Sequence, residues 1–404
     1  MMRSPTLVRV ARGQLCTGCG LCAGISAGAI TLQNEPPGFT RPIQTRSLEP
    51  GQEAIIAAAC PAVTIDNRPD APNDDPLWGP WHFTGTGYAT DAALRHRASS
   101  GGVLSALLVH ALATGLVDEV IETAMDSAAP LANITVSARN AAGVFAAAGS
   151  RYASSSPLAR IDQILEAPGR FAFVGKPCDV SALRALARID PRVDAKVPLM
   201  LAFFCAGVPS GDGARRILAA IDAPEAEVTA FRYRGDGWPG SATATLADGS
   251  TRAMSYHDSW GKILSQEIQF RCKICPDAVG SAADIACADA WYGDDDGYPT
   301  FEESEGRSLV MARTPRGSAL LDEAVAAGAI VVEVLDSRDI ERMQPSQTRR
   351  KREIIARLAA VAVAGRPVPR YRGVQLAAAA RQAPLAQQIR SFAGLVRRFV
   401  LRRT

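Results

Sequence analysis

Three closely spaced cysteines near the start of the chain limit most strongly what this protein can fold into. They are Cys16, Cys19 and Cys22 in the stretch CTGCGLC. Three thiolates at this spacing wrap one face of a cubane iron–sulfur cluster, and in bacterial ferredoxins a remote cysteine that precedes a proline is a further ligand. Cys60 precedes Pro61 after a stretch of ferredoxin-like length. We therefore predict that these four cysteines bind one 4Fe–4S cluster, the alternative being a structural zinc site.

Four of the other five cysteines stand where an α/β fold would bring them together. Cys178 directly follows the strand-like run FAFVG, and Cys205 ends the run LMLAFFC. Cys272 and Cys275 form a C-x2-C pair. Open α/β sheets place their sites at the carboxyl ends of strands, where these cysteines would face one cavity. The spacing leaves two interpretations open: a second 4Fe–4S site, or buried packing cysteines beside an unrelated C-x2-C pair.

The surroundings of two cysteines lead to separate expectations. Cys178 starts a helix in which Asp179 is the expected N-cap. A helix N-terminus and the nearby Lys176 would both favour its thiolate form. Cys287 lies in the apolar run ADIACADAW, so we expect it to pack in the core.

Composition divides the chain into four segments. Residues 1–66 hold the first four cysteines, residues 67–84 read as a linker, residues 85–341 alternate strands with helices, and residues 342–404 read as a helical basic tail. Strands are expected at VDEVIETA, RFAFVG, LMLAFFC, VTAFRY, SLVMAR and AIVVEVL, and a hairpin around Pro36-Pro37-Gly38. The pattern predicts an α/β fold with a mainly parallel or mixed sheet and an N-terminal ferredoxin-like α+β unit.

Charge is unevenly distributed along the chain although the net charge is only +3. From Arg342 onward, fifteen Lys and Arg stand against one acid, Glu353, so this segment carries +14 and the remainder −11. A basic tail on an acidic body predicts contact with an acidic protein, a membrane surface or another polyanion, unless the tail is simply solvated. Nucleic-acid binding is not expected, because the tail has few aromatic residues and no base-reading module.

The hydrophobic pattern and the cysteine content predict a cytoplasmic protein. The first fifteen residues lack the apolar core of a signal peptide, and no run reaches the roughly 18 apolar residues of a membrane span. Cytosolic cysteines seldom form disulfides, so nine of them indicate metal binding or redox chemistry.

Two polar loops are candidates for binding a cofactor. A run of small residues precedes an apolar helical pattern at residues 103–112, and glycines before a helix let exposed amides meet a phosphate. The alternative is an ordinary capped core helix. The second loop, GSRYASS, offers an arginine for phosphate and a tyrosine for stacking on a ring. The candidate binding residues are Ser99, Ser100, Gly101, Gly102, Ser150, Arg151 and Tyr152.

Several of these motifs together resemble a known family. ASSGG, GSRYASSSPL, GKPCDVSAL, FFCAGVPS and RCKICPDAVGSAADIACADAWYG are similar to the beta subunits of coenzyme F420 (deazaflavin) hydrogenases and dehydrogenases. That family includes divinyl-protochlorophyllide 8-vinyl reductase and 7-hydroxymethyl chlorophyll a reductase. The resemblance spans roughly residues 10–345 and leaves out the tail; Ala288 stands where the family usually has glycine.

The resemblance implies cofactors and a reaction class. It implies FAD in the α/β domain, one 4Fe–4S cluster near the flavin, formed by Cys178, Cys205, Cys272 and Cys275, and in many members an N-terminal cluster. The expected function is an oxidoreductase that passes electrons through two clusters to or from FAD. Ferredoxin or a deazaflavin carrier would be its redox partner, with an unidentified small-molecule substrate.

Two side chains are candidates for the chemistry, and two other functions remain open. His257, beside Asp258, is a candidate proton donor, and Lys176 is a candidate to hold anionic groups of flavin or substrate. One alternative is a non-catalytic electron-transfer subunit that delivers electrons to a partner subunit. The other is a zinc-stabilised binding module.

Overall fold

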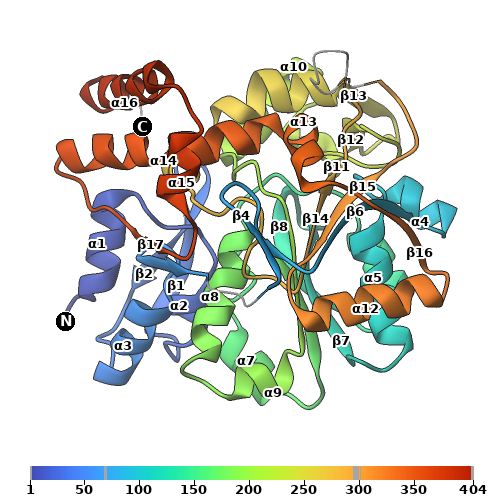
Figure 1. Ribbon diagram of the computed structural model, residues 1–404, viewed down its shortest axis with the longest axis horizontal. Coiled ribbons are helices and arrows are strands. Elements are labelled where there is room, and N and C mark those ends of the chain that lie inside the picture. The colour runs from blue at the N-terminus through green and yellow to red at the C-terminus, as the bar shows by residue number, and fades with distance from the viewer. Residues whose placement is uncertain (1, 68–70, 294–299, 301, 402–404) are drawn as a thin grey trace.

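An eight-stranded mixed sheet crosses the centre of the computed structural model, which describes residues 2–67, 71–293, 300 and 302–401 (Figure 1). Its strand order is β16-β6-β15-β14-β10-β9-β7-β8. The four strands β14, β10, β9 and β7 are parallel to one another, and the outer strands pair antiparallel. The strands are β6 (Phe83–Ala89), β7 (Glu119–Asp126), β8 (Ala129–Ala138), β9 (Phe171–Gly175), β10 (Leu199–Phe203), β14 (Ile285–Asp289), β15 (Ser308–Ala312) and β16 (Ile330–Val334). The predicted mixed α/β class is therefore confirmed.

Alternate residues of the parallel strands face two separate cores. In β9, Ala172 and Val174 join one apolar cluster, while Phe171 and Phe173 join another. Because successive side chains of a strand point to opposite faces, helices cover both sides of the sheet. One face carries α5 (Val103–Ala113), α6 (Ala141–Ala147) and α12 (Pro315–Ala326), and the other carries α7 (Ile161–Glu166), α8 (Pro177–Ala187) and α9 (Arg192–Lys196).

The N-terminal unit packs against the α8 face of the sheet. Its β1–β2 pair is the predicted hairpin. Cys19, Leu21 and Ala59 share an apolar cluster with Phe173 and with Leu183 of α8. The elements of the unit are α1 (Pro5–Gly13), α2 (Leu21–Gly24), β1 (Ile30–Glu35), β2 (Phe39–Gln44), α3 (Pro50–Ala59) and β3 (Thr64–Asp66). The unit is thus joined to the sheet domain by apolar packing as well as by the chain.

A second, smaller sheet lies beyond the carboxyl ends of the parallel strands. Its antiparallel order is β11-β12-β13, and α10 packs near it through a separate apolar cluster. The elements are α10 (Gly211–Ala220), β11 (Val228–Arg232), β12 (Ser241–Leu246), β13 (Thr251–Ser255) and the π-helical segment η2 (His257–Ile263). The predicted strand VTAFRY therefore belongs to this small sheet, not to the central one.

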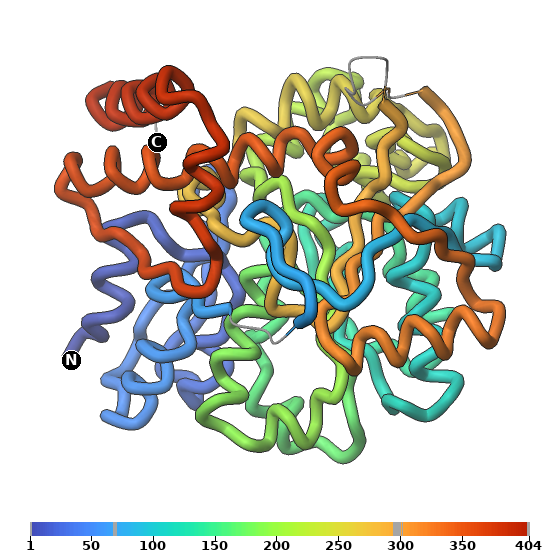
Figure 2. The backbone as a smooth tube through the Cα atoms, viewed as in Figure 1, coloured from blue at the N-terminus to red at the C-terminus, as the bar shows by residue number. Residues whose placement is uncertain are grey.

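The C-terminal segment returns to the N-terminal unit. Figure 2 shows its red path running beside the blue start of the chain. β17 pairs in parallel with β3, with Arg370 opposite Thr64. The Arg9 side chain donates a 2.8 Å hydrogen bond to the Val368 carbonyl. The segment comprises α14 (Pro345–Val363), β17 (Arg370–Arg372), α15 (Leu376–Arg381) and α16 (Leu385–Val400).

Part of this basic segment is core. Ile354, Ala360 and Val361 of α14 are fully buried, and the latter two share a cluster with Val10 and Ile274. The interpretation of a simply solvated tail is therefore wrong for α14. Its apolar residues pack against the N-terminal unit and against the domain that contains the central sheet. Among the helices that the structure describes, none is long and apolar enough to cross a membrane.

A buried arginine fixes the segment expected to be a linker. Within residues 67–84, β4 (Asn73–Asp75) and β5 (Gly79–Trp81) form a hairpin with Trp78 buried between them. Arg313, which is fully buried, donates to the carbonyls of Trp78 and Pro80 at 2.6 and 2.9 Å. It also donates to the Val279 carbonyl at 2.6 Å.

Replacing this arginine should destabilise the fold. Arg313→Met leaves three buried carbonyls without a donor, so we expect the free energy of unfolding to fall by about 2–4 kcal/mol. Arg313→Lys keeps the charge but not the planar fork, and its loss should be intermediate. Chemical denaturation measures both, and a wild-type midpoint for Arg313→Met would contradict the prediction.

Candidate functional site

The first four predicted cysteines come together around one small cavity. Its volume is about 30 Å³, and Cys16, Cys19, Cys22 and Cys60 all line it among apolar residues. Gly20 has a φ of 86°, and a Cβ there would lie 2.8 Å from the backbone nitrogen of Ala159. Only glycine therefore allows this loop to approach the neighbouring segment so closely.

Burial dominates the electrostatics of this set. It raises the pKa of the Cys60 thiol to about 11 and also raises that of Cys16, against the opposing charge of Arg41. Burial raises the pKa of Cys22 further above the usual value, with added repulsion from Cys19 and Cys16. Four thiols that repel one another as thiolates in an apolar space have the donor chemistry of a metal–sulfur site.

The second four cysteines also lie together, at the carboxyl ends of two parallel strands. Cys178 follows β9, Cys205 follows β10, and Cys272 lies in α11 (Phe270–Lys273), with Cys275 just beyond it. Burial, together with the neighbouring Cys272 and Cys275, raises the pKa of Cys205 to about 12. The structure therefore brings together the set that sequence position alone left open.

The expected environment of Cys178 is partly wrong. Lys176, not Asp179, occupies the N-cap of α8; the Asp179 carboxylate lies in the first turn and accepts a 3.0 Å bond from the Lys176 backbone nitrogen. Burial raises the pKa of the Cys178 thiol well above its usual value, Asp179 raises it further, and Lys176 opposes both. Desolvation therefore outweighs the helix terminus and the lysine that were expected to favour the thiolate.

Neither cysteine set has the geometry of a single-ion site. Within the described ranges, no group of three or more His, Cys, Asp or Glu side chains is placed to hold one metal ion. Cys287 stands apart from both sets, in the apolar cluster of the sheet, as expected for a packing residue. Burial alone raises the pKa of its thiol to about 12.

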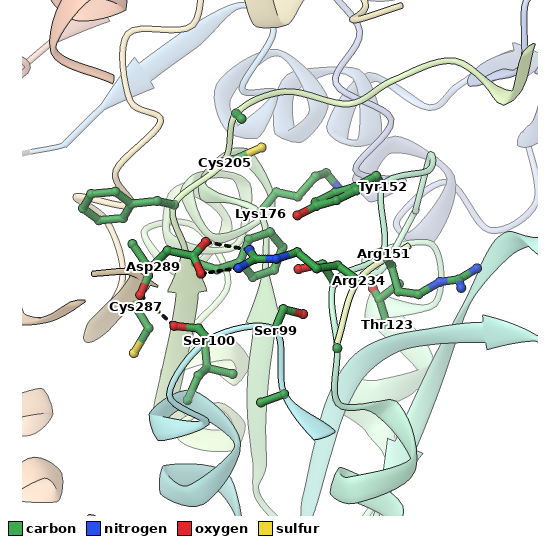
Figure 3. Close-up of a pocket in the computed structure, with 18 of the residues that line it drawn as sticks. Ser99, Ser100, Thr123, Arg151, Tyr152, Lys176, Cys205, Arg234, Cys287 and Asp289 are labelled. Atoms are coloured by element: carbon green, nitrogen blue, oxygen red, sulfur yellow. Dashed lines mark hydrogen bonds and ion pairs between the residues drawn. The ribbon is translucent and has the colours of Figure 1, made fainter. Parts of the chain in front are cut away.

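A cavity of about 300 Å³ lies beside the second cysteine set (Figure 3). Cys205 lines it, and so does Cys287, which sequence reasoning had placed only in the core. Its walls come from the loop before α5, the loop at 149–155, the ends of β9, β10 and β14, and the start of α14. Of the predicted binding residues, those that line the cavity are Ser99, Ser100, Gly102, Ser150, Arg151, Tyr152 and Lys176.

The loop before α5 contributes one available hydroxyl. The Ser99 Oγ is buried without a hydrogen-bond partner among the described residues. The Ser100 Oγ is already engaged, donating to the Ala288 or Arg307 carbonyl, each at 3.1 Å. Gly101 lies behind the cavity wall, where a Cβ would come within 2.5 Å of the Gly87 carbonyl oxygen. Its predicted role in binding is therefore replaced by a packing role in the structure.

The second loop places a ring, but not a cation, toward the cavity. The Arg151 guanidinium donates to the Asn133 side chain and to three carbonyls, including that of Phe231, and points away in Figure 3. Pairing with a phosphate, as predicted, would require these bonds to break. Tyr152 packs its ring 4.7 Å from that of Trp260, measured between centroids.

Lys176 is held by its own local partners. Its Nζ lies 2.7 Å from Asp179 Oδ2 and donates a 2.6 Å bond to Ser155 Oγ. Burial disfavours the ammonium most strongly, but Asp179, through its charge and its hydrogen bond, and the neighbouring cysteines together keep the pKa of Lys176 raised. His257 is exposed at the start of η2 and is not among the residues that line the cavity.

An ion pair that sequence reasoning missed closes another side of the cavity. Arg234 donates two 2.7 Å bonds to the Asp289 carboxylate, which also accepts from the Trp238 indole at 2.9 Å. The guanidinium lies over the rings of Tyr256 and Trp291. Asp289 ends β14, so its position at a strand end was a signal that could have found it. Arg234 lies in the loop between β11 and β12 and gave no such signal.

One acidic side chain that lines the cavity, that of Glu122, has no ion-pair partner among the described residues. Glu122 of β7 is 7% exposed, and its Oε1 has no hydrogen-bond partner in the part of the chain that the structure describes. Burial raises the pKa of this carboxyl to about 8. A carboxyl with such a pKa exchanges protons near neutral pH.

Comparison with known proteins agrees with this architecture. The N-terminal model of the coenzyme F420 hydrogenase/dehydrogenase beta subunit matches residues 84–161, and the C-terminal model matches residues 169–338. The chain belongs to this family. Family members from Methanococcus voltae and Methanosarcina barkeri, both named coenzyme F420 hydrogenase subunit beta, are each 25% identical, over 269 and 285 residues. These matches cover 64% and 67% of this chain and 84% and 87% of the relatives.

A solved structure shares the fold of the family. A chain of the F420-reducing [NiFe] hydrogenase complex from Methanosarcina barkeri superposes with a TM-score of 0.51 at 22% identity. The match covers 70% of this chain and 96% of that one. The family models end at residue 338, so α14 and its contacts with the cavity lie outside the residues that they match.

The buried carboxyl predicts a pH-dependent stability. Because the pKa of Glu122 rises from 4.5 to about 8 on folding, the folded state keeps a proton that the unfolded chain releases in this window. Stability should therefore fall as pH rises through it. Glu122→Gln should remove this slope and stabilise the protein above pH 8 by about 2–4 kcal/mol.

Denaturation at several pH values measures this effect. Glu323→Gln, an exposed site on α12, is the matched control and should keep the wild-type slope. Identical slopes for Glu122→Gln and the wild-type protein would contradict the prediction.

Proposed function

We propose that this chain is an iron–sulfur flavoprotein oxidoreductase with two 4Fe–4S clusters and one FAD. The observation that carries the proposal is the sorting of eight cysteines into two sets, each gathered in one place, with Cys205 also lining the large cavity. Membership of a redox family supports the same reading. The clusters exchange single electrons, and a flavin exchanges two.

The residues of the cavity suit the ring system of a flavin in kind. A volume of about 300 Å³ lies at the lower end of small-molecule sites. The rings of Tyr152, Tyr256 and Trp291 offer flat apolar walls, and the unpaired Ser99 hydroxyl offers a hydrogen bond. Glu122 is better placed than His257 to hold or release a proton, because it lines the cavity while His257 lies outside it.

Electron transfer to a partner subunit is the second candidate function. It is favoured by the names of the relatives, which are beta subunits of coenzyme F420 hydrogenases. In that case the chain would bind the same groups and pass electrons to a separate catalytic subunit. Reduction of a small molecule by the isolated chain distinguishes the two functions.

Iron and flavin content tests the proposal directly. Protein purified without oxygen should contain about eight irons in two cubane clusters, with about one FAD. Cys60→Ala and Cys178→Ala should each remove about four irons, because each breaks a different set. Cys287→Ala is the matched control and should keep all of them. A colourless protein that contains zinc would contradict the proposal.

An acidic redox protein such as a ferredoxin is the proposed electron donor, and a deazaflavin carrier is the alternative. Exposed Arg397 and Arg398 lie on α16, and the charge of Arg398 reaches Lys273, between two cysteines of the second set. This basic face would attract an acidic protein close to the site. A membrane surface would be attracted by the same charge.

Salt should separate these donors. The rate of reduction by ferredoxin should fall about tenfold from low to high ionic strength, since exposed charges are screened. Arg397→Gln/Arg398→Gln should produce a similar loss at low salt, whereas Arg139→Gln, an exposed arginine beyond β8, should not. A rate that is insensitive to salt and to both variants would contradict the ferredoxin proposal.

A further inference from the structure

Arg271 lies between the two cysteine sets. It is 1% exposed and directly precedes Cys272 in α11. Its Nη2 donates a 3.0 Å hydrogen bond to the carbonyl of Pro61, the residue after Cys60. One side chain therefore connects a ligand segment of the first set with a ligand segment of the second, although 210 positions separate the bonded residues.

The C-terminal segment holds this guanidinium in place. The ring of Tyr371, in β17, lies 5.4 Å from the Arg271 Cζ. The Tyr371 hydroxyl donates a 2.8 Å bond to the carbonyl of Ile274, which lies between Cys272 and Cys275. β17 also pairs with β3 of the N-terminal unit. The Tyr371 ring is therefore held against both the N-terminal unit and the segment that contains Cys272 and Cys275.

The charge of Arg271 acts on both sets. Burial raises the pKa of Cys60 and of Cys275, and the guanidinium opposes the rise at each. Two other arginines provide a contrast, because Arg41 opposes the rise at Cys16 and Arg350 at Cys205 and Cys275. Arg350 thus acts on the second set and Arg271 on both. Arg41 acts on the first set, and it also donates to Gln269, whose amide lies 3.5 Å from the Cys272 Sγ.

A nearby carboxylate does not cancel this effect. Asp179 raises the pKa of Cys19 and of Cys178, so it also acts on both sets. Its charge is paired with the Lys176 Nζ at 2.7 Å. The guanidinium of Arg271 contacts an aromatic ring and a backbone carbonyl, and neither of these groups carries a negative charge that would neutralise it.

We propose that Arg271 is a positioning residue that stabilises the negative charge of both cysteine sites and so sets their reduction potentials together. The inference rests on the proposed function. Adding one electron from an external reductant makes a four-thiolate cluster more negative by one charge, without forming or breaking a bond to the protein. A fixed cation in a low-dielectric interior stabilises that added charge.

The test is a redox titration of the complete protein with dithionite, followed by electron paramagnetic resonance. Arg271→Gln should move both cluster signals to more negative potentials, while Arg271→Lys, which keeps the charge, should move them less. Arg350→Gln, whose charge opposes the rise at Cys205 and Cys275, should move only the second signal. Unchanged potentials in Arg271→Gln, or a shift of one signal alone, would overturn the inference.

Iron content separates this inference from the proposed function. A wild-type protein without iron would overturn the proposed function and, with it, the role of Arg271. If Arg271→Gln fails to bind iron, the lysine variant decides: recovered iron supports a role for the charge. Equal loss of iron in both variants would overturn it.

Discussion

The structure depends on burying eight cysteine side chains while placing positive charge close to the thiolates that they can form. Burial raises the pKa of nearly all of these thiols, because an isolated thiolate is costly in an apolar interior. The chain places cations against them from different elements, Arg41 from the hairpin, Arg271 from α11 and Arg350 from α14. The cations that face the two sets thus come from all three parts of the fold.

The C-terminal segment is what makes that packing possible. Arg350 donates to the Cys205 and Ala206 carbonyls, and Lys351 Nζ donates to that of Pro276 at 2.8 Å. Gln344 and Gln347, at the start of the same segment, line the large cavity. Residues beyond the matched family models thus complete both the cavity and the second cysteine set. A segment that composition marks as a charged tail is, in three dimensions, a wall of the large cavity and a neighbour of the second cysteine set.

Sequence reasoning identified the cysteine sets, because cysteine spacing and strand ends indicate them. The C-x2-C-x2-C run and the remote Cys-Pro gave the first set, and the positions of Cys178 and Cys205 after two strands gave half of the second. It missed Arg234 and the role of α14 because their partners are distant in sequence. It missed Glu122 because the sequence does not show that this face of β7 borders a cavity. It misjudged Arg151 for a related reason: an arginine in a polar loop looks available for an anion, whereas here backbone carbonyls occupy it.

The parallel pairing of β3 with β17 has a consequence for how this chain can be divided. A strand of the N-terminal unit is completed by residues more than 300 positions later, so its partner strand is synthesised long after it. Pairings of such sequence separation form slowly, because a long loop must close first. The cysteine-rich unit is thus not a detachable module. A fragment that ends after residue 66 would expose an unpaired strand edge and an apolar surface.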